Sequence, residues 1–232
     1  MNNMRSPLII ALDFAQPEQA LALAQQLGSE RCYVKVGKEL FTRSGASFVA
    51  QLVDLGFKVF LDLKYHDIPN TVAKACQAAA DLGVWMVNVH ALGGRDMLMA
   101  ARDSLEGYSQ RPLLIAVTLL TSLGEEDLSG MGLHGTLQDN VLRLARLSKA
   151  AGLDGLVCSP QEIQLIRQNV DENLVLVTPG IRPAFSVKDD QKRTMTPKQA
   201  LEAGASYLVV GRPVIAAPDP LQALRNIEAE IA

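Results

Sequence analysis

The chain has 232 residues, 48% of them hydrophobic and 20% charged, values typical of a globular protein that buries one sizeable core. Its formal net charge of −3 leaves no strongly basic surface for binding nucleic acid or an anionic membrane. The longest apolar run, 113–120, is too short to span a bilayer, no signal peptide is readable, and three scattered cysteines suit a reducing compartment. We therefore expect a cytoplasmic protein without nucleic-acid or membrane partners.

Apolar runs rich in β-branched residues alternate along the chain with amphipathic segments of helical period. The runs predict eight strands, at 7–14, 33–37, 58–64, 86–91, 113–120, 155–159, 174–181 and 207–211. The clearest helical segments are 17–27, 45–55, 71–82, 138–151 and 160–168. Near-continuous apolar strands, each followed by a helix, indicate a parallel sheet that is buried on both faces.

This alternation predicts a single (β/α)8 TIM barrel formed by one domain over residues 1–232, because no linker or low-complexity run divides the chain. An open doubly wound sheet is the alternative, but eight evenly spaced units favour closure. In such a barrel the functional side chains lie where strands end and the following loops begin. Polar residues at strand ends are therefore the first candidates for a site.

The third predicted strand ends in an unusual charged segment, Phe-Leu-Asp-Leu-Lys-Tyr-His-Asp-Ile-Pro-Asn-Thr at 60–71. Asp62 and Lys64 are two residues apart, so they leave the same face of the strand, and Asp67 follows in the turn before Pro69. Charges on an apolar strand are costly to bury unless they are paired. The segment therefore indicates a site rather than part of the core.

Seven of the eight predicted strand ends carry polar groups, and these alternate in charge. They are Asp13, Lys35, Asp62 with Lys64, Asn88 with His90, Thr121 with Ser122, Arg182, and Gly211 with Arg212. Gly211 would let the backbone approach a ligand closely, and Arg212 carries a planar set of donors that suits phosphate. Barrels frequently bind phosphate after the seventh and eighth strands, so we expect a phosphorylated ligand.

Two polar loops are candidates for a lid over this rim. The loop 182–196 contains Arg182 and Gln191 and is long for a connection between a strand and a helix. The glycine-rich stretch 124–135 after the fifth strand is the second candidate.

The segment Asp62-Leu-Lys-Tyr-His-Asp67-Ile-Pro-Asn-Thr71 resembles the signature of the orotidine 5′-phosphate decarboxylase family in its bacterial form. Other matching pieces follow in the family's order over almost the whole chain: Ala11-Leu-Asp13, Val34-Lys-Val-Gly37, Val89-His-Ala91, Leu120-Thr-Ser122, Pro179-Gly-Ile-Arg182, Gln191 and Val210-Gly-Arg-Pro213. The resemblance implies decarboxylation of orotidine 5′-monophosphate to UMP and carbon dioxide, the last step of de novo UMP synthesis, without a metal or organic cofactor.

The resemblance also implies a role for each matching residue. Lys35, Asp62, Lys64 and Asp67 would form the charged network at the reacting carbon, and Lys64 would protonate C6. Asp67 and Thr71 would reach across a homodimer interface into the neighbouring site. The remaining residues would hold the substrate: Asp13 and Lys35 the ribose, Thr121 or Ser122 the pyrimidine, and Gln191, Gly211 and Arg212 the phosphate, with Arg182 shaping the same pocket.

Two other functions share part of this pattern. A magnesium-dependent sugar-phosphate decarboxylase or aldolase of the same barrel suprafamily also carries Asp-x-Lys-x-x-Asp, but the continuation through Thr71, with Lys35 and Gln191, favours the orotidylate enzyme. A non-catalytic barrel that binds a phosphorylated ligand would not need both lysines and both aspartates.

Two histidines lie near the charged residues in the sequence. We expect His66 to have a packing or positioning role and His90 to support the charged network.

Overall fold

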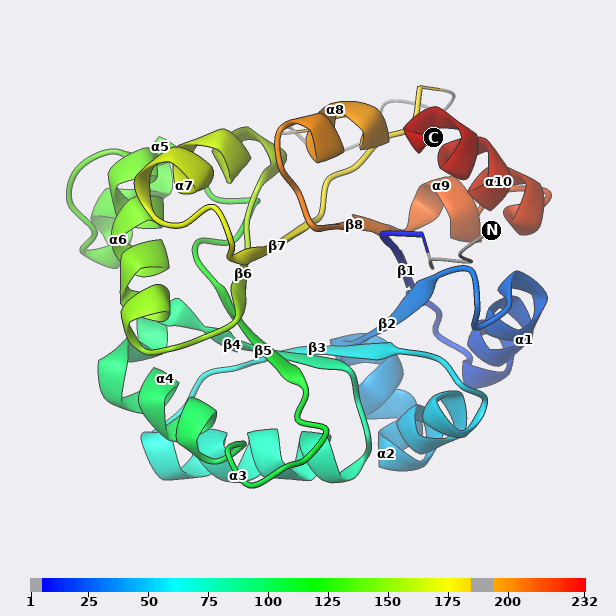
Figure 1. The fold of residues 1–232 in the computed structure, drawn as a ribbon, viewed down its shortest axis with the longest axis horizontal. Helices are drawn as coiled ribbons and strands as arrows, with labels where there is room; N and C mark the ends of the chain where they lie inside the picture. Colours follow the sequence, from blue (N-terminus) through cyan, green and yellow to red (C-terminus); the bar gives the residue numbers. More distant parts are fainter. Residues whose placement is uncertain (1–5, 185–193) are drawn as a thin grey trace.

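The computed structural model describes residues 6–184 and 194–232, and it has eight parallel strands in a closed barrel. The strands are β1 Leu8–Ala11, β2 Tyr33–Gly37, β3 Val59–Tyr65, β4 Met86–His90, β5 Leu113–Val117, β6 Gly155–Val157, β7 Val175–Thr178 and β8 Tyr207–Val210. The helices form a ring outside the barrel (Figure 1). Because β1 pairs with both β2 and β8, the sheet has no edge; the predicted barrel is confirmed and the open sheet is excluded.

Helices follow every strand of the barrel. They are α1 Pro17–Leu27, α2 Lys38–Asp54, α3 Pro69–Asp81, α4 Gly94–Asp103, α5 Glu125–Leu128, α6 Leu137–Ala150, α7 Ile163–Asn169, α8 Pro197–Glu202, α9 Arg212–Ile215 and α10 Pro220–Ile231, with short 3-10 turns η1 Ala91–Gly93, η2 Ser129–Met131 and η3 Pro160–Glu162. The glycine-rich stretch 124–135 thus contains α5 and η2. In the part of the chain that the structure describes, no helix has both the length and the apolar character needed to cross a membrane.

Two predicted helices differ from the structure. α2 begins at Lys38 rather than at residue 45, and Gly45 lies inside it with a φ of 69°. Glycine adopts this left-handed backbone at little cost, so the chain bends there and the helix continues beyond it. The predicted helix 160–168 is divided into η3 and α7.

The interior of the barrel is filled by apolar side chains below its polar end. The inward-facing residues Ile9, Phe60, Met86, Ile115 and Val177 are buried in one cluster. Beneath them Trp85 lies with its ring centroid 4.2 Å from Tyr33 and 5.0 Å from Tyr207. These aromatic residues lie at or just before the first residues of their strands, so they close the amino-terminal end of the barrel.

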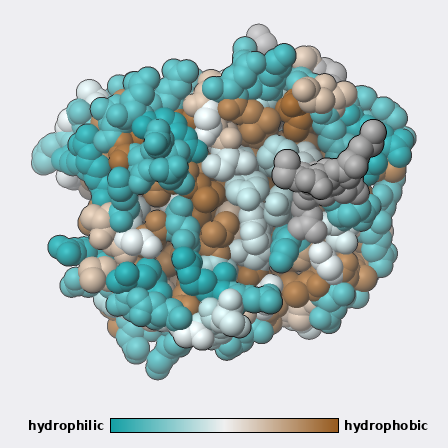
Figure 2. Space-filling view, in the orientation of Figure 1, coloured by the Kyte–Doolittle hydropathy of each residue, from teal (hydrophilic) through white to brown (hydrophobic). Residues whose placement is uncertain are grey.

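A second and larger core lies between the outer face of the barrel and the helices. Helices bury the apolar residues of one face against the sheet, such as Ala20, Leu23 and Leu27 of α1. Figure 2 shows hydrophilic side chains over the outer helices and hydrophobic ones toward the middle of the viewed face. With its floor filled, the barrel leaves the carboxyl-terminal end of the strands as the place for a ligand.

Candidate active site

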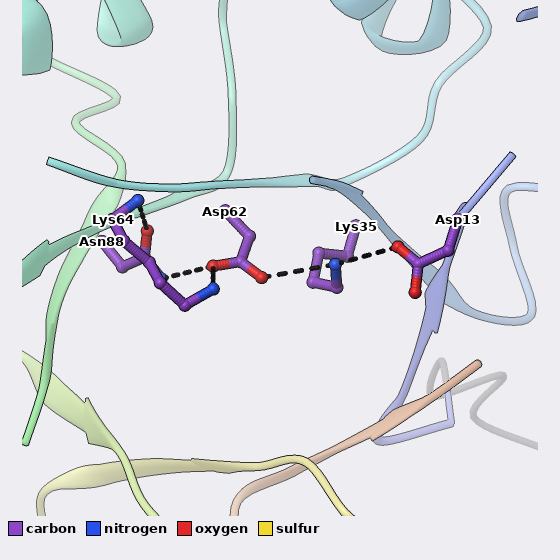
Figure 3. Close-up of polar contacts among 5 residues, drawn as sticks. All are labelled: Asp13, Lys35, Asp62, Lys64 and Asn88. Carbon is purple, nitrogen blue, oxygen red and sulfur yellow. Dashed lines mark hydrogen bonds and ion pairs between the residues drawn. The ribbon is translucent and has the colours of Figure 1, made fainter. Parts of the chain in front are cut away.

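Four charged side chains and one amide form a row across the inner face of β1 to β4 (Figure 3). Asp62 is at its centre: its Oδ1 lies 2.6 Å from the Nζ of Lys64, and its Oδ2 lies 3.3 Å from the Nζ of Lys35. The Lys35 ammonium also lies 3.4 Å from Oδ1 of Asp13, which follows β1. From β4, the Asn88 side chain donates to Oδ1 of Asp62 at 2.7 Å. The predicted clustering of these strand-end charges is therefore present in the fold.

The strand register explains why these side chains meet. β2 and β3 pair in parallel with Lys35 opposite Phe60 and Gly37 opposite Asp62. Because side chains alternate between the two faces of a strand, Lys35 and Asp62 both point into the barrel. A Cβ atom at Gly37 would lie 3.2 Å from the Lys35 ammonium, so glycine at this position leaves room for the ion pairs.

The carboxylate of Asp62 is almost wholly removed from water. Asp62 is 9% exposed and Lys35 is 8% exposed. Burial raises the pKa of Asp62, but the charges of Lys35 and Lys64 and hydrogen bonds from Lys64 and Asn88 outweigh it, so the net pKa lies below its usual range. The site therefore holds a fixed negative charge between two ammonium groups at neutral pH.

Lys64 has a backbone conformation that side-chain-bearing residues rarely adopt. Its φ is 55°, and among the described residues no other non-glycine residue has a positive φ. The pairing of β3 with β4 shifts register between Leu61 and Tyr65, so the strand is irregular at this residue. Such a conformation costs about 1–3 kcal/mol and persists where surrounding contacts hold it. At Lys64 the backbone N–H donates to Oδ1 of Asn88 at 2.8 Å.

A cavity of about 180 Å³ lies against the charged row. Lys35, Asp62 and Lys64 line one side of it. The remaining lining residues are mostly apolar: Phe60, Val117, Leu119, Leu120, Thr121, Val157, Val177, Pro179 and Val209. Charges facing an apolar wall interact more strongly than charges in water, because little solvent screens them. The cavity can therefore place a bound group in a strong and fixed electric field.

Of the other predicted binding residues, one lines this cavity and one lies outside the described part of the chain. Thr121 lines the cavity, and a Cβ atom at Gly211 would lie 3.7 Å from Oδ2 of Asp13. Arg212 is the exposed first residue of α9. Arg182 follows β7, is half-buried, and donates to the carbonyl of Ile181 at 2.9 Å. Gln191 lies outside the described residues.

Asp67 and Thr71 do not join the charged row. Both are exposed, and the Asp67 carboxylate accepts a hydrogen bond from the backbone N–H of Ile68 at 2.6 Å. The Ile68 side chain between them is 67% exposed, which is unusual for a large apolar residue. Within one chain, the predicted network thus contains Lys35, Asp62 and Lys64 but not Asp67.

Two polar residues of β4 lie at the site: Asn88, which was predicted only as a polar strand end, and His90, which was expected to support the charged network. Asn88 is fully buried, and His90 is half-buried with its ring centroid 5.5 Å from that of His66. Burial, followed by the charges of His66 and Lys64, lowers the pKa of His90 to about 4, so its ring is neutral at physiological pH. The available signal was the sequence Met-Val-Asn-Val-His, which repeats polar residues at the period of a strand.

Metal-ligating side chains do not cluster in residues 6–184 and 194–232: no three His, Cys, Asp or Glu residues lie close enough together to hold an ion. Both carboxylate oxygens of Asp62 already contact ammonium groups. Cys32, Cys76 and Cys158 are buried free thiols.

The fold and the site together define a (β/α)8-barrel protein with paired lysine and aspartate side chains at the end of β3. The family model described as "Orotidine 5'-phosphate decarboxylase / HUMPS family" matches residues 6–227, and the chain belongs to this family. This confirms the family resemblance found in the sequence.

Several relatives match the chain over nearly its whole length. It is 58% identical to the orotidine 5'-phosphate decarboxylase of Nitrosococcus oceani over 228 residues, which cover 98% of each chain. It is also 58% identical to the protein of the same name from Chromobacterium violaceum over 227 residues, covering 98% of this chain and 92% of that one. A crystal structure of orotidine 5'-phosphate decarboxylase from Lactobacillus acidophilus superimposes with a TM-score of 0.86 at 41% identity, covering 97% of this chain and 98% of that one.

Proposed function

We propose that this protein is a cytoplasmic enzyme that decarboxylates orotidine 5′-monophosphate to UMP and carbon dioxide, the last step of de novo UMP synthesis. The whole chain would act as one catalytic domain, without a metal or organic cofactor. The observation that carries the proposal is the row Lys35–Asp62–Lys64 facing an apolar cavity at the carboxyl-terminal end of the barrel. The name shared by full-length relatives at 58% identity supports the choice of substrate.

The chemistry of this reaction explains why fixed charge is needed. Loss of carbon dioxide from C6 of the pyrimidine leaves a localised vinyl carbanion that has no adjacent electron sink, and a cofactor would normally supply one. An ammonium about 3 Å from the carbanion would stabilise it by roughly 5 kcal/mol at an effective dielectric constant near 20. Lys64 is suited to this position, because its ammonium can also donate the proton that C6 requires.

A single ammonium does not account for the whole acceleration, since the most effective enzymes lower barriers by roughly 20 kcal/mol. The rest would come from preorganised charge and from remote binding energy. The Asp62 carboxylate, ionised and held by two cations, would lie beside the departing carboxylate and raise the free energy of the bound substrate. Decarboxylation removes this repulsion, because the product carries no carboxylate.

Different residues would bind the ribose, the pyrimidine and the phosphate of the substrate. Asp13, which follows β1, and Lys35 of β2 would hold the ribose hydroxyls, since their charged groups lie 3.4 Å apart. Thr121, which lines the cavity, would contact the pyrimidine, with Ser122 as its neighbour. The phosphate would be bound by Arg212, the Gly211 backbone and Gln191, with Arg182 shaping the pocket.

We also propose a homodimer in which Asp67 and Thr71 enter the neighbouring site. Asp67 has no contact with the charged row of its own chain, and both residues are exposed. Between them lies Ile68, which leaves most of its apolar surface in water in a single chain. Covering this side chain at a subunit interface would stabilise the dimer by the hydrophobic effect.

The first prediction is that activity does not depend on a metal. Protein treated with EDTA and then freed of small molecules should still consume orotidine 5′-monophosphate, followed as a loss of absorbance. The physical reason is that the Asp62 oxygens are engaged by two ammonium groups rather than open to an ion. Activity that returns only with magnesium would favour the sugar-phosphate enzymes, and binding without turnover would favour a ligand-binding barrel.

The second prediction concerns the phosphate. Arg212→Ala should lower kcat/KM by roughly 100-fold, because losing a charge-assisted, bidentate contact costs about 3 kcal/mol. Arg31→Ala is a matched control, since Arg31 pairs with Glu228 and precedes β2 at the opposite end of the barrel. Steady-state kinetics should show this loss for Arg212→Ala and an unchanged kcat/KM for Arg31→Ala. Equal kcat/KM values for both variants would place the phosphate elsewhere.

A further inference from the structure

We propose that Asn88 is the positioning residue that fixes the backbone of Lys64 and the carboxylate of Asp62 in their reactive arrangement. The inference rests on the proposed function, because it assigns Asn88 an effect on the chemical step.

The Asn88 side chain bridges two parts of β3 with one amide group. Its Oδ1 accepts the backbone N–H of Lys64 at 2.8 Å, and its Nδ2 donates to Oδ1 of Asp62 at 2.7 Å. Asn88 has no exposed surface, so water does not compete for either bond. Figure 3 shows Asn88 at one end of the charged row, beside Lys64 and Asp62. The two partners also fix the orientation of the Asn88 amide. The Lys64 N–H requires an acceptor, which is the amide oxygen, and the Asp62 carboxylate requires a donor, which is the amide NH2 group.

Lys64 needs this support because its backbone leaves the regular pairing of the sheet. β3 and β4 are paired at Leu61 and again at Tyr65, and the register shifts between these residues. The Lys64 N–H therefore bonds to a side chain of β4 instead of a strand carbonyl. With φ at 55°, the backbone would relax toward the extended region if this acceptor were removed. Relaxation would move the origin of the Lys64 side chain and turn its ammonium away from the reacting carbon.

The same amide holds the negative charge that pairs with Lys64. Oδ1 of Asp62 receives both the Asn88 amide and the Lys64 ammonium, which lies 2.6 Å away. The Asp62 side chain cannot rotate without losing one of these contacts. Asn88 thus couples the position of the lysine to the position of the carboxylate, and neither alanine nor leucine can supply the two bonds.

The test compares three variants of the full-length protein. Asn88→Ala removes both bonds, and Asn88→Leu also removes them but retains most of the side-chain volume. Asn140→Ala is the matched control, because Asn140 of α6 is 2% exposed and its amide donates to the carbonyls of His134 and Thr136, which both precede this helix. The measurements are kcat with orotidine 5′-monophosphate, the dissociation constant of UMP by calorimetry, and the midpoint of thermal unfolding.

Both Asn88 variants should lose about 100-fold in kcat, since displacing a reacting group by about 1 Å has an effect of this size. UMP binding should change less than about threefold, because ribose and phosphate contacts remain intact. Asn140→Ala should lower the unfolding midpoint while kcat stays at the wild-type value.

Three results would overturn the inference while leaving the proposed function in place. If the wild-type protein turns over substrate and Asn88→Ala retains its kcat, Asn88 does not position Lys64, and the proposed function stands. If Asn88→Leu restores the kcat lost in Asn88→Ala, the residue only fills space. If kcat, UMP affinity and the unfolding midpoint of the Asn88 variants all fall together, the role of Asn88 is structural. An inactive wild-type protein would overturn the proposed function and this inference together.

Discussion

Lys64→Ala should almost abolish turnover while leaving a folded barrel. In the proposed mechanism the substitution removes the cation beside the carbanion, a loss of roughly 5 kcal/mol at an effective dielectric constant near 20, and it also removes the proposed proton donor. Together these effects predict that kcat falls by at least about 10⁴-fold. The fold should survive because Lys35 and Asn88 still contact Asp62 after the ammonium is lost. Kinetics, thermal unfolding and UMP binding measured on the same preparation would separate chemistry from stability.

Lys58→Ala provides the matched control for this experiment. Lys58 is exposed and immediately precedes the first residue of β3, so it lies at the opposite end of the same strand. Its removal should leave kcat at the wild-type value. If Lys64→Ala retained more than about one tenth of the wild-type kcat, Lys64 would be neither the main cation nor the proton donor.

Mixing two inactive variants should recover activity if sites are shared between subunits. Asp67→Ala is expected to be severely impaired, because its carboxylate is proposed to complete the partner's site. A heterodimer of Asp67→Ala and Lys64→Ala chains would contain one intact site, with Lys64 from the first chain and Asp67 from the second. Its other site would carry both defects. Activity should therefore approach half of the wild-type value per heterodimer, measured after subunit exchange has been verified by mass spectrometry.

The control mixture pairs Lys64→Ala with Asp62→Ala. Because Lys64 and Asp62 contact each other within one chain, every site of this heterodimer carries one of the two defects. No activity should return in this mixture. If verified exchange between the Asp67→Ala and Lys64→Ala chains also restored nothing, the site would not be shared, although the decarboxylase function would stand.

Much of the fold could be predicted because the hydrophobic pattern is regular. The bounds of α1 and β2 agree with the predicted 17–27 and 33–37. Most other strands are shorter than predicted at their carboxyl-terminal ends: β5 stops at Val117, although the apolar run extends to Leu120. The extra apolar residues leave the sheet and line the cavity, so hydrophobicity alone did not mark the end of the strand.

The site could be predicted in composition but not in detail. Charged residues at strand ends converge in any closed parallel barrel, which is why Asp13, Lys35 and Asp62 were found together. The left-handed backbone of Lys64 could not be predicted, because a two-residue period carries no sign of a register shift. For the same reason the bridging role of Asn88 was not visible. Asp67 lies beyond the end of β3, where strand geometry no longer constrains a side chain.

The charged residues of this protein differ in their exposure to dissolved salt, because apolar side chains fill the floor of the barrel. Lys35 and Asp62 lie above buried side chains such as Phe60, and both are less than 10% exposed, whereas Arg212 lies on the surface. Mobile ions screen exposed charges over a Debye length of about 8 Å at physiological ionic strength, but they screen buried pairs much less. Attraction of an anionic ligand to the barrel mouth is therefore set jointly by protein and solution, while the field inside the cavity is set by the protein alone.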